Sequence, residues 1–271
     1  MSSNALARRM DAPDPAEEEN MPTTTAGKTA EPKMEARTAD RIRAGIARYR
    51  TWERHRDAGF LDAAETLQQA QIARLRRTHA DSLADARFQP ITEFFLSEIY
   101  TGLDLEELAR EIEKALPVAT RMLPDSVMRT AATAVELNAL TGELDEEVVR
   151  DLIAHGQAEN PSDADIVAAY RRCGHYDQRR EQMRLLRELG LGLDRYVRSR
   201  LITATFKMAS RPAHMAGLGG LYDFMGQGFA VMKPMKSVAD FLDTFIGREQ
   251  RILDVLENSD DDPFADETAH D

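Results

Sequence analysis

The chain has 271 residues, of which 42% are hydrophobic and 30% charged, and its formal net charge is −12. This apolar share is enough for the core of one large domain or two small ones, while the acidic balance argues against nucleic-acid binding by net attraction. With one cysteine the chain can form neither an internal disulfide nor a cysteine cage for zinc, and a reducing compartment fits best.

Residues 1–35 are rich in Pro, Thr, Ala and Glu and hold almost no large apolar side chains. Such a segment cannot bury enough surface to offset the entropy lost on ordering, so we expect a disordered tail. The tail has no apolar stretch typical of a secretory signal, and no later segment is an uninterrupted apolar run long enough to span a membrane. The sequence therefore predicts a cytoplasmic protein.

Residues 36–84 predict an N-terminal helical hairpin. Apolar side chains recur at three-to-four-residue spacing, beginning with Ile42, Ile46 and Tyr49, and they continue in the second half of the segment. Gly59 is a suitable break between two antiparallel helices.

Residues 85–256 predict a helical bundle domain. Pro124 stands where a helix-first proline belongs, and Gly142 is expected to end the helix that follows. Ser162, with Asp165 three residues later, is a second helix-start signal. No segment shows the alternation of a half-buried strand.

Residues 257–271 contain seven acids and no Lys or Arg, which predicts an acidic disordered tail. Between the two tails we expect about nine or ten helices. The predicted fold class is therefore all-α, an irregular multi-helix bundle with disordered N- and C-terminal tails.

The segment from Phe94 to Tyr100 reads Phe-Phe-Leu-Ser-Glu-Ile-Tyr and resembles a group of uncharacterised bacterial proteins named for a Phe-Phe-Leu-Glu-Glu-Leu-Tyr (FFLEELY) motif. Ser97 and Ile99 replace the first Glu and the second Leu. Dispersed further matches, spanning roughly residues 88–255, are Leu123-Pro124, Glu136-Leu137-Asn138, Arg211-Pro212-Ala213, Ala216-Gly217-Leu218, Phe241-Leu242 and Arg248-Glu249. The resemblance implies an all-helical intracellular protein and brings no activity with it.

Ionisable side chains among apolar helical stripes suggest a buried polar or ligand site. On a helix, Glu98 would sit between apolar faces, where a carboxylate must be paired, hydrogen-bonded or protonated. It would be either a site acid or ligand, or a structural anchor to an arginine such as Arg211 or Arg248. The candidate residues for this site are Glu98, Tyr100, Glu136, Arg211, His214, Arg248 and Glu249.

The segment Arg211–Met232 contains five glycines, which are costly inside a helix. Two interpretations account for them. The small residues either allow a neighbouring helix to pack tightly, or they leave room for a flat or apolar ligand bordered by methionines.

Arginines cluster twice. Seven lie between Arg37 and Arg56, and nine lie between Arg171 and Arg200. The first run carries a tryptophan that could stack or anchor, so the candidate surface for an acidic protein or other anionic partner is Arg48, Arg50, Trp52 and Arg54. The alternatives are a solvated face paired with acids of neighbouring helices, or screening by the acidic C-terminal tail.

The six histidines are scattered without metal-ligand spacing, so we predict no metal site and no cofactor; an axial histidine to haem, His175 or His214, is a minor alternative. No nucleophile or phosphate-binding loop has a recognisable context. The leading hypothesis is a non-enzymatic interaction or regulatory protein. The alternative is an α-helical enzyme, or a small-molecule or cofactor-binding protein, with its site near the Phe94–Tyr100 helix and the Arg211–Met232 segment.

Overall fold

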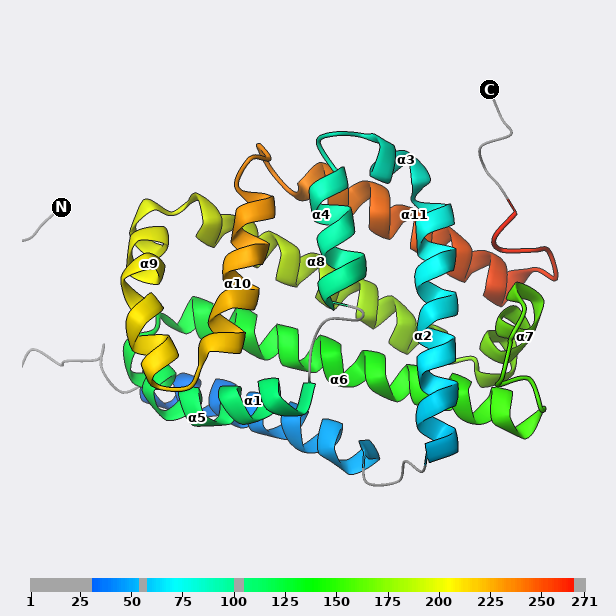
Figure 1. Cartoon of the computed structure of the whole chain (residues 1–271), viewed down its shortest axis with the longest axis horizontal. Helices are drawn as coiled ribbons and strands as arrows, with labels where there is room; N and C mark the ends of the chain where they lie inside the picture. Colours follow the sequence, from blue (N-terminus) through cyan, green and yellow to red (C-terminus); the bar gives the residue numbers. More distant parts are fainter. Residues whose placement is uncertain (1–30, 54–57, 100–104, 266–271) are drawn as a thin grey trace, which may run out of the picture.

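The computed structural model describes residues 31–53, 58–99 and 105–265 (Figure 1). These residues form eleven α-helices and one π-helical segment, with no strand in the described ranges. The elements are α1 (Glu31–Glu53), α2 (Ala58–Thr78), α3 (Ala80–Ala84), α4 (Gln89–Phe94), η1 (Phe95–Ile99), α5 (Leu105–Met122), α6 (Asp125–Ala154), α7 (Asp163–Cys173), α8 (Tyr176–Arg198), α9 (Arg200–Met215), α10 (Gly219–Met232) and α11 (Ala239–Asn258). The predicted all-α class is confirmed, with more helices than the nine or ten expected.

The longest helix, α6, is the axis on which the others are arranged. It packs against α1, α2, α7 and α8. Helix α8 runs antiparallel to it: the Tyr196 hydroxyl donates to the carbonyl of Ser126 at 2.6 Å, and Gln182 Nε2 donates to Thr141 Oγ1 at 2.7 Å. These bonds fix the register between α6 and α8, which matters for the site.

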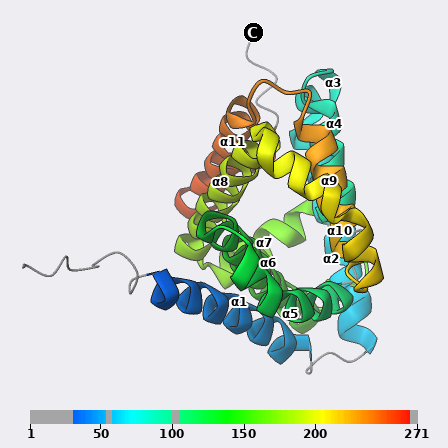
Figure 2. The same cartoon turned by 90° about the vertical axis from the view of Figure 1, so that its left-hand side faces the viewer.

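Viewed along the long axis, the helices form a three-sided ring (Figure 2). Helices α1, α5 and α6 make one side, α8 and α11 the second, and α2, α4 and α10 the third. Helix α9 crosses from the second side to the third at the near end.

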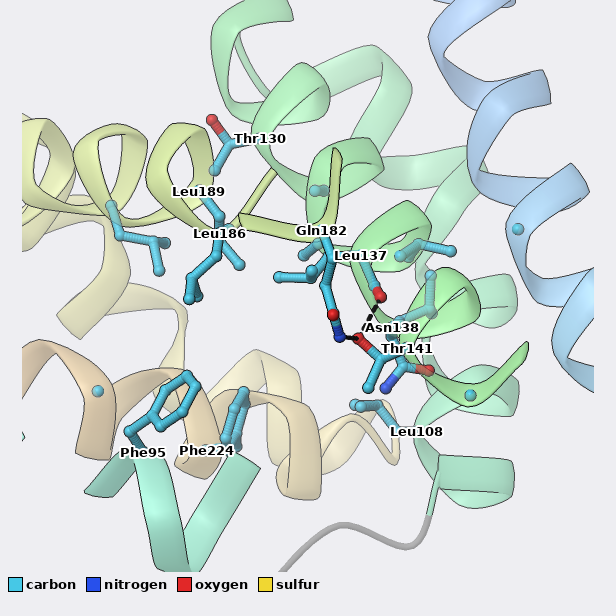
Figure 3. Close-up of a pocket in the computed structure, with 18 of the residues that line it drawn as sticks. Phe95, Leu108, Thr130, Leu137, Asn138, Thr141, Gln182, Leu186, Leu189 and Phe224 are labelled. Atoms are coloured by element: carbon cyan, nitrogen blue, oxygen red, sulfur yellow. Dashed lines mark hydrogen bonds between the residues drawn. The ribbon is translucent and has the colours of Figure 1, made fainter. Parts of the chain in front are cut away.

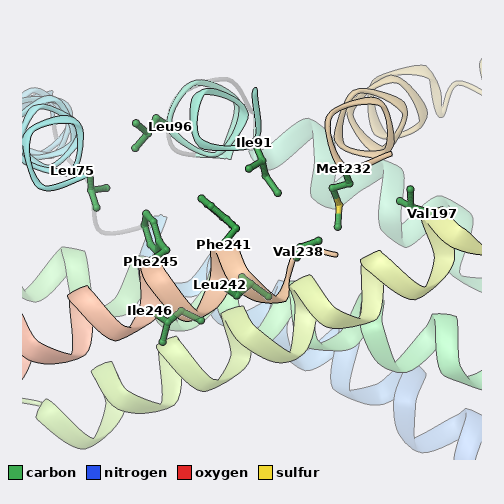
Figure 4. Close-up of a cluster of buried hydrophobic side chains, with 10 residues drawn as sticks. All are labelled: Leu75, Ile91, Leu96, Val197, Met232, Val238, Phe241, Leu242, Phe245 and Ile246. Atoms are coloured by element: carbon green, nitrogen blue, oxygen red, sulfur yellow. The ribbon is translucent and has the colours of Figure 1, made fainter. Parts of the chain in front are cut away.

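The best-packed cluster lies between α11 and its neighbours (Figure 4). Phe241 and Phe245 point toward α2 and α4, while Leu242 and Ile246 point toward α8. Phe245 meets the edge of Phe95 with ring centroids 5.0 Å apart. Fully burying each such side chain stabilises the fold by roughly 1.5–3 kcal/mol, so this cluster fixes α11 within the ring.

Helices α1 and α2, predicted as a hairpin, both pack on α6. Ile42 and Ile46 are buried against it, and Gly45 allows the close approach because a Cβ there would lie 2.5 Å from Val135 Cγ1. The division into a hairpin at 36–84 and a bundle at 85–256 stays a prediction.

Two helix-boundary predictions had different outcomes. Ser162 caps α7 in a capping box: its hydroxyl accepts from the Asp165 N–H, and the Asp165 carboxylate accepts from the Ser162 N–H. The predicted helix end at Gly142 is wrong, because α6 continues to Ala154. Leu144 and Val148 extend the buried stripe beyond the glycine, and their burial outweighs its low helix propensity.

The described part of the predicted acidic tail packs on the bundle. Arg171 Nη2 donates to the carbonyls of Ser259 and Asp261 at 2.8 and 2.7 Å. The Phe264 ring lies 5.5 Å from the guanidinium carbon of Arg74. Residues 259–265 therefore lie against α7 and α2, while residues 1–30 and 266–271 lie outside the described ranges.

Candidate functional site

The ring of helices encloses an elongated cavity of about 1380 Å³ (Figure 3). Ordinary small-molecule sites have roughly 300–1,000 Å³, so this space is large for a compact ligand. Side chains from most helices of the bundle line it, and most of them are aliphatic or aromatic. In Figure 3, Leu186 and Leu189 face Phe95 and Phe224 across the space.

Helix α6 forms one long wall. Its lining residues recur every three or four positions from Pro124 to Val149, so they share one helix face. At 1.5 Å per residue this wall is about 37 Å long. Its character changes along the chain, as the lining residues Val127, Ala131, Ala134, Asn138, Thr141 and Asp145 show.

Aromatic side chains dominate the end formed by α9 and α10. Phe94 stacks on Phe224 with centroids 5.7 Å apart, and Phe206 lies 5.0 Å from Phe229. All four line the cavity. The glycines of α10 make this packing close, since a Cβ on Gly228 would lie 3.3 Å from the Phe94 ring. The glycine-rich segment therefore packs tightly and borders an apolar space, and the interpretation that this space holds a ligand stays a prediction.

Large apolar side chains at this same end are exposed. Leu201 and Met122 line the cavity and keep 77% and 76% of their surface accessible. Exposed side chains of this size at a cavity margin are typical of an opening through which an apolar molecule enters.

The opposite end of the cavity, between α2, α6 and α7, is polar. Gln71 Nε2 donates to Asp145 Oδ1 at 3.0 Å and to the Tyr170 hydroxyl at 2.8 Å. Burial raises the pKa of Asp145, which the Gln71 hydrogen bond and the charge of Arg179 oppose. Burial likewise raises the pKa of the Tyr170 hydroxyl. Phe264, from the C-terminal segment, also lines the cavity.

Arg179, on α8, is the cation of this polar end. It lines the cavity with 8% of its surface accessible, and its guanidinium carbon lies 4.3 Å from the centroid of the Tyr170 ring. Its Nε donates a long 3.4 Å hydrogen bond to the Gly174 carbonyl. Its Nη2 is buried and has no hydrogen-bond partner in the described structure. This nitrogen therefore lacks an acceptor, and leaving a buried charged donor unsatisfied costs free energy.

A second buried polar cluster lies beside the polar end and is closed. Arg74 Nη1 donates to both carboxylate oxygens of Glu249 at 2.6 Å, and His79 Nε2 lies 2.9 Å from Glu249 Oε1. His79 is wholly buried and stacks on Phe245 at 4.1 Å. Burial alone would raise the pKa of Glu249, but the charge of Arg74 and the hydrogen bonds from His79 and Arg74 lower it to about 2.

The predicted polar site is brought together only in part. Glu249 joins this closed cluster, and the neighbouring Arg248 donates to Asp81 at 2.7 Å. Glu136 lies on another side of the bundle, where it accepts from Arg41 at 2.7 Å.

Two further members of the predicted set lie on α9. Arg211 is exposed, and His214 Nε2 lies 3.2 Å from Asp223. The Glu98 side chain and Tyr100 lie outside the described residues. The described members of the set therefore do not form a single site.

Four polar residues of the cavity were missed, namely Gln71, Asp145, Tyr170 and Arg179. One of them carried a sequence signal. Arg179 precedes Leu186 by seven residues and Leu193 by fourteen, so the three share one face of α8. A charged residue aligned with an apolar stripe indicates a buried cation.

The arginines of the predicted partner surface contact α6 where the structure describes them. Arg48 Nε donates to Glu143 Oε1 at 2.8 Å, two helical turns from the analogous Arg41–Glu136 pair on the same two helices, and both pairs are partly exposed to solvent. The side chains of Arg50, Trp52 and Arg54 lie outside the described residues. The described pairs favour the alternative in which these arginines bind acids of a neighbouring helix.

Within the described ranges, no group of three or more His, Cys, Asp or Glu side chains is arranged to hold a metal ion. In the same ranges, no helix has both the length and the apolar character needed to cross a membrane.

The family model of the domain of unknown function DUF8198 matches residues 51–263. This match covers most of the helical bundle, including α2 and every helix that lines the cavity except α1. Neither the curated proteins nor the solved structures contain a match to the chain.

Proposed function

The chain belongs to the DUF8198 family, and we propose that it is a non-enzymatic binding protein for an elongated, largely apolar small molecule. The observation that carries this proposal is the cavity of about 1380 Å³ with its aliphatic and aromatic lining. The proposal places the site where the Phe94–Tyr100 and Arg211–Met232 segments meet α6 and α8. A cytoplasmic location and kinship with the FFLEELY group are further parts of the proposal.

The apolar lining supports binding because side chains facing a cavity lose the dispersion contacts that a packed core would provide. An apolar ligand restores those contacts and leaves water, which favours binding by about 25 cal/mol per Å² of apolar surface removed from water. The long wall of α6 favours an extended ligand over a compact one.

The polar groups around the cavity support binding over catalysis. The charged ones, among them Arg74, Asp145 and Arg179, lie toward one end, as in sites where polar groups orient a ligand. Glu249, whose pKa is lowered to about 2, is held by Arg74 and His79 in a hydrogen-bonded network. Such a network is typical of a structural role.

Titration of the full chain with a neutral, environment-sensitive fluorescent probe such as N-phenyl-1-naphthylamine tests the proposal. We expect saturable binding near one equivalent. Ala131→Trp should weaken it at least ten-fold, because Ala131 faces the cavity and an indole there occupies ligand space. Ala154→Trp is the matched control, since Ala154 is exposed on the same helix and does not line the cavity.

Two results would contradict the proposal. One is the absence of saturable binding to the wild-type chain. The other is equal affinity of the Ala131→Trp and Ala154→Trp variants, provided that both unfold at temperatures close to that of the wild type. Native mass spectrometry of protein purified from its own cells would then identify the ligand by mass.

A further inference from the structure

The cavity is amphipathic from end to end because α6 and α8 are antiparallel. Along α6 the lining changes from Val127 and Ala131 to Thr141 and Asp145. Helix α8 begins with polar residues and becomes leucine-rich. The hydrogen bond from Gln182 to Thr141 shows that the two polar halves lie side by side. The charged lining residues of both helices, Asp145, Glu146 and Arg179, therefore lie at one end, and apolar residues dominate the other.

The polar end contains one cation whose hydrogen-bonding capacity is largely unused. Arg179 is more than nine-tenths buried and makes only a long hydrogen bond from Nε, and its buried Nη2 has no partner among the described residues. A guanidinium has five N–H donors in a planar fork, and that fork matches a carboxylate. An anion entering this end would supply the missing acceptors.

Nearby acids do not neutralise this cation by direct pairing. Asp145 accepts from Gln71 through Oδ1 and forms no ion pair with Arg179 within 4.0 Å in the described structure. The charge of the other lining arginine, Arg74, is matched by Glu249. Of the two arginines that line the cavity, Arg179 is therefore the one without a directly paired acid in the described structure, and a single guanidinium favours one negative charge over a dianionic phosphate.

We propose that the ligand is a long-chain monocarboxylate whose carboxylate accepts hydrogen bonds from the guanidinium of Arg179. The hydrocarbon chain then lies along the α6–α8 wall, with its tail toward Phe206 and Phe224. This inference rests on the proposed function and adds to it the class of ligand and its orientation. Phe264 lies at the head end, where it shields the ion pair from water.

The test compares two ligands of equal length, hexadecanoate and 1-hexadecanol, by displacement of the fluorescent probe from the full chain. A hydrogen bond to a charged group corresponds to roughly 10- to 150-fold in affinity. We expect the wild type to prefer hexadecanoate by a factor in this range. Arg179→Gln should abolish the preference by weakening hexadecanoate binding, with the affinity for hexadecanol unchanged.

Two control variants separate a specific effect from a structural one. Arg180→Gln changes the adjacent arginine, which pairs with Glu257 on the outer surface, and should retain the full preference. Arg179→Lys keeps the positive charge and should restore part of the preference. Circular dichroism of each variant verifies that the helical content is that of the wild type.

The outcomes distinguish this inference from the proposed function. If the wild type binds neither ligand, both fail. If it binds the acid and the alcohol equally, or if Arg179→Gln keeps the wild-type preference, the carboxylate assignment fails and the binding function stands. If Arg179→Gln fails to fold, the folded Arg179→Lys variant decides: a preference for hexadecanoate smaller than that of the wild type supports the assignment, and an unchanged preference overturns it.

Discussion

The buried ion pair between Arg74 and Glu249 allows a quantitative test of the packing of α2 against α11. Glu249→Gln removes the charged carboxylate to which the buried guanidinium of Arg74 donates, while Arg74 stays beside His79. Breaking a buried pair from one side costs about 3–5 kcal/mol. At roughly 2–4 °C per kcal/mol for a chain of this size, the midpoint of thermal unfolding should fall by about 6–20 °C.

The matched control lies two residues further along α2. Arg76 pairs with Glu93 through two hydrogen bonds of 3.0 and 2.7 Å, but both side chains are more than two-fifths exposed. Exposed pairs contribute about 0–1 kcal/mol, so Glu93→Gln should lower the midpoint by less than about 4 °C. Thermal unfolding followed by circular dichroism measures both. Equal shifts for Glu249→Gln and Glu93→Gln would refute the claim that burial sets the difference.

Two more predictions concern pH and helix contacts. The pKa of Glu249 is about 2 in the folded chain and 4.5 ordinarily, so between these pH values the unfolded chain binds a proton at Glu249 that the folded chain does not. The stabilisation that the ionised Glu249 carboxylate provides is thus complete above about pH 4.5 and is lost as the pH falls toward 2. The midpoint of urea unfolding should drop over this range, and less steeply in Glu249→Gln. Gly45→Ala should lower stability by about 1–3 kcal/mol, because its Cβ would meet Val135 at 2.5 Å. Gly247→Ala, where the nearest atom is Arg251 Nη1 at 3.9 Å, should instead raise stability by up to about 1 kcal/mol; urea unfolding that ranks the two variants the other way would contradict the packing argument.

The fold class followed from the sequence because helical periodicity and helix caps are local signals. The capping box at Ser162 and Asp165 needs only four consecutive residues, and the structure contains both of its hydrogen bonds. Gly142 misled for the same reason. A local rule predicts that a helix ends at a glycine. Helix α6 continues past Gly142 and packs against α2, α7 and α8, and no local sequence pattern specifies these contacts.

The segments that border the cavity were predictable, and the cavity was not. Phe94 and Phe224 line the cavity, but an apolar side chain facing a void and one facing another helix follow the same periodicity in the sequence. Whether a ring of helices closes on itself or leaves a space depends on long-range distances between helices. The described members of the candidate polar set are dispersed for a similar reason: Glu136 and His214 are both ionisable residues on helices, but each faces a different neighbour.

Arg179 shows where sequence reasoning could have gone further. It was counted among nine arginines of a single run, and a run of like charges indicates a solvated face. Adjacent residues of a helix point about 100° apart, so Arg179 and Arg180 cannot share that face. The seven-residue spacing from Arg179 to Leu186 assigns Arg179 to the apolar side, and the structure places it there, buried. A charge held on an apolar face without an acid partner favours a functional interpretation, because burial of an unpaired cation costs stability that packing alone does not return. The proposed carboxylate would supply the acceptor that the described chain does not provide, so we expect the head group, more than the cavity, to determine which ligand binds.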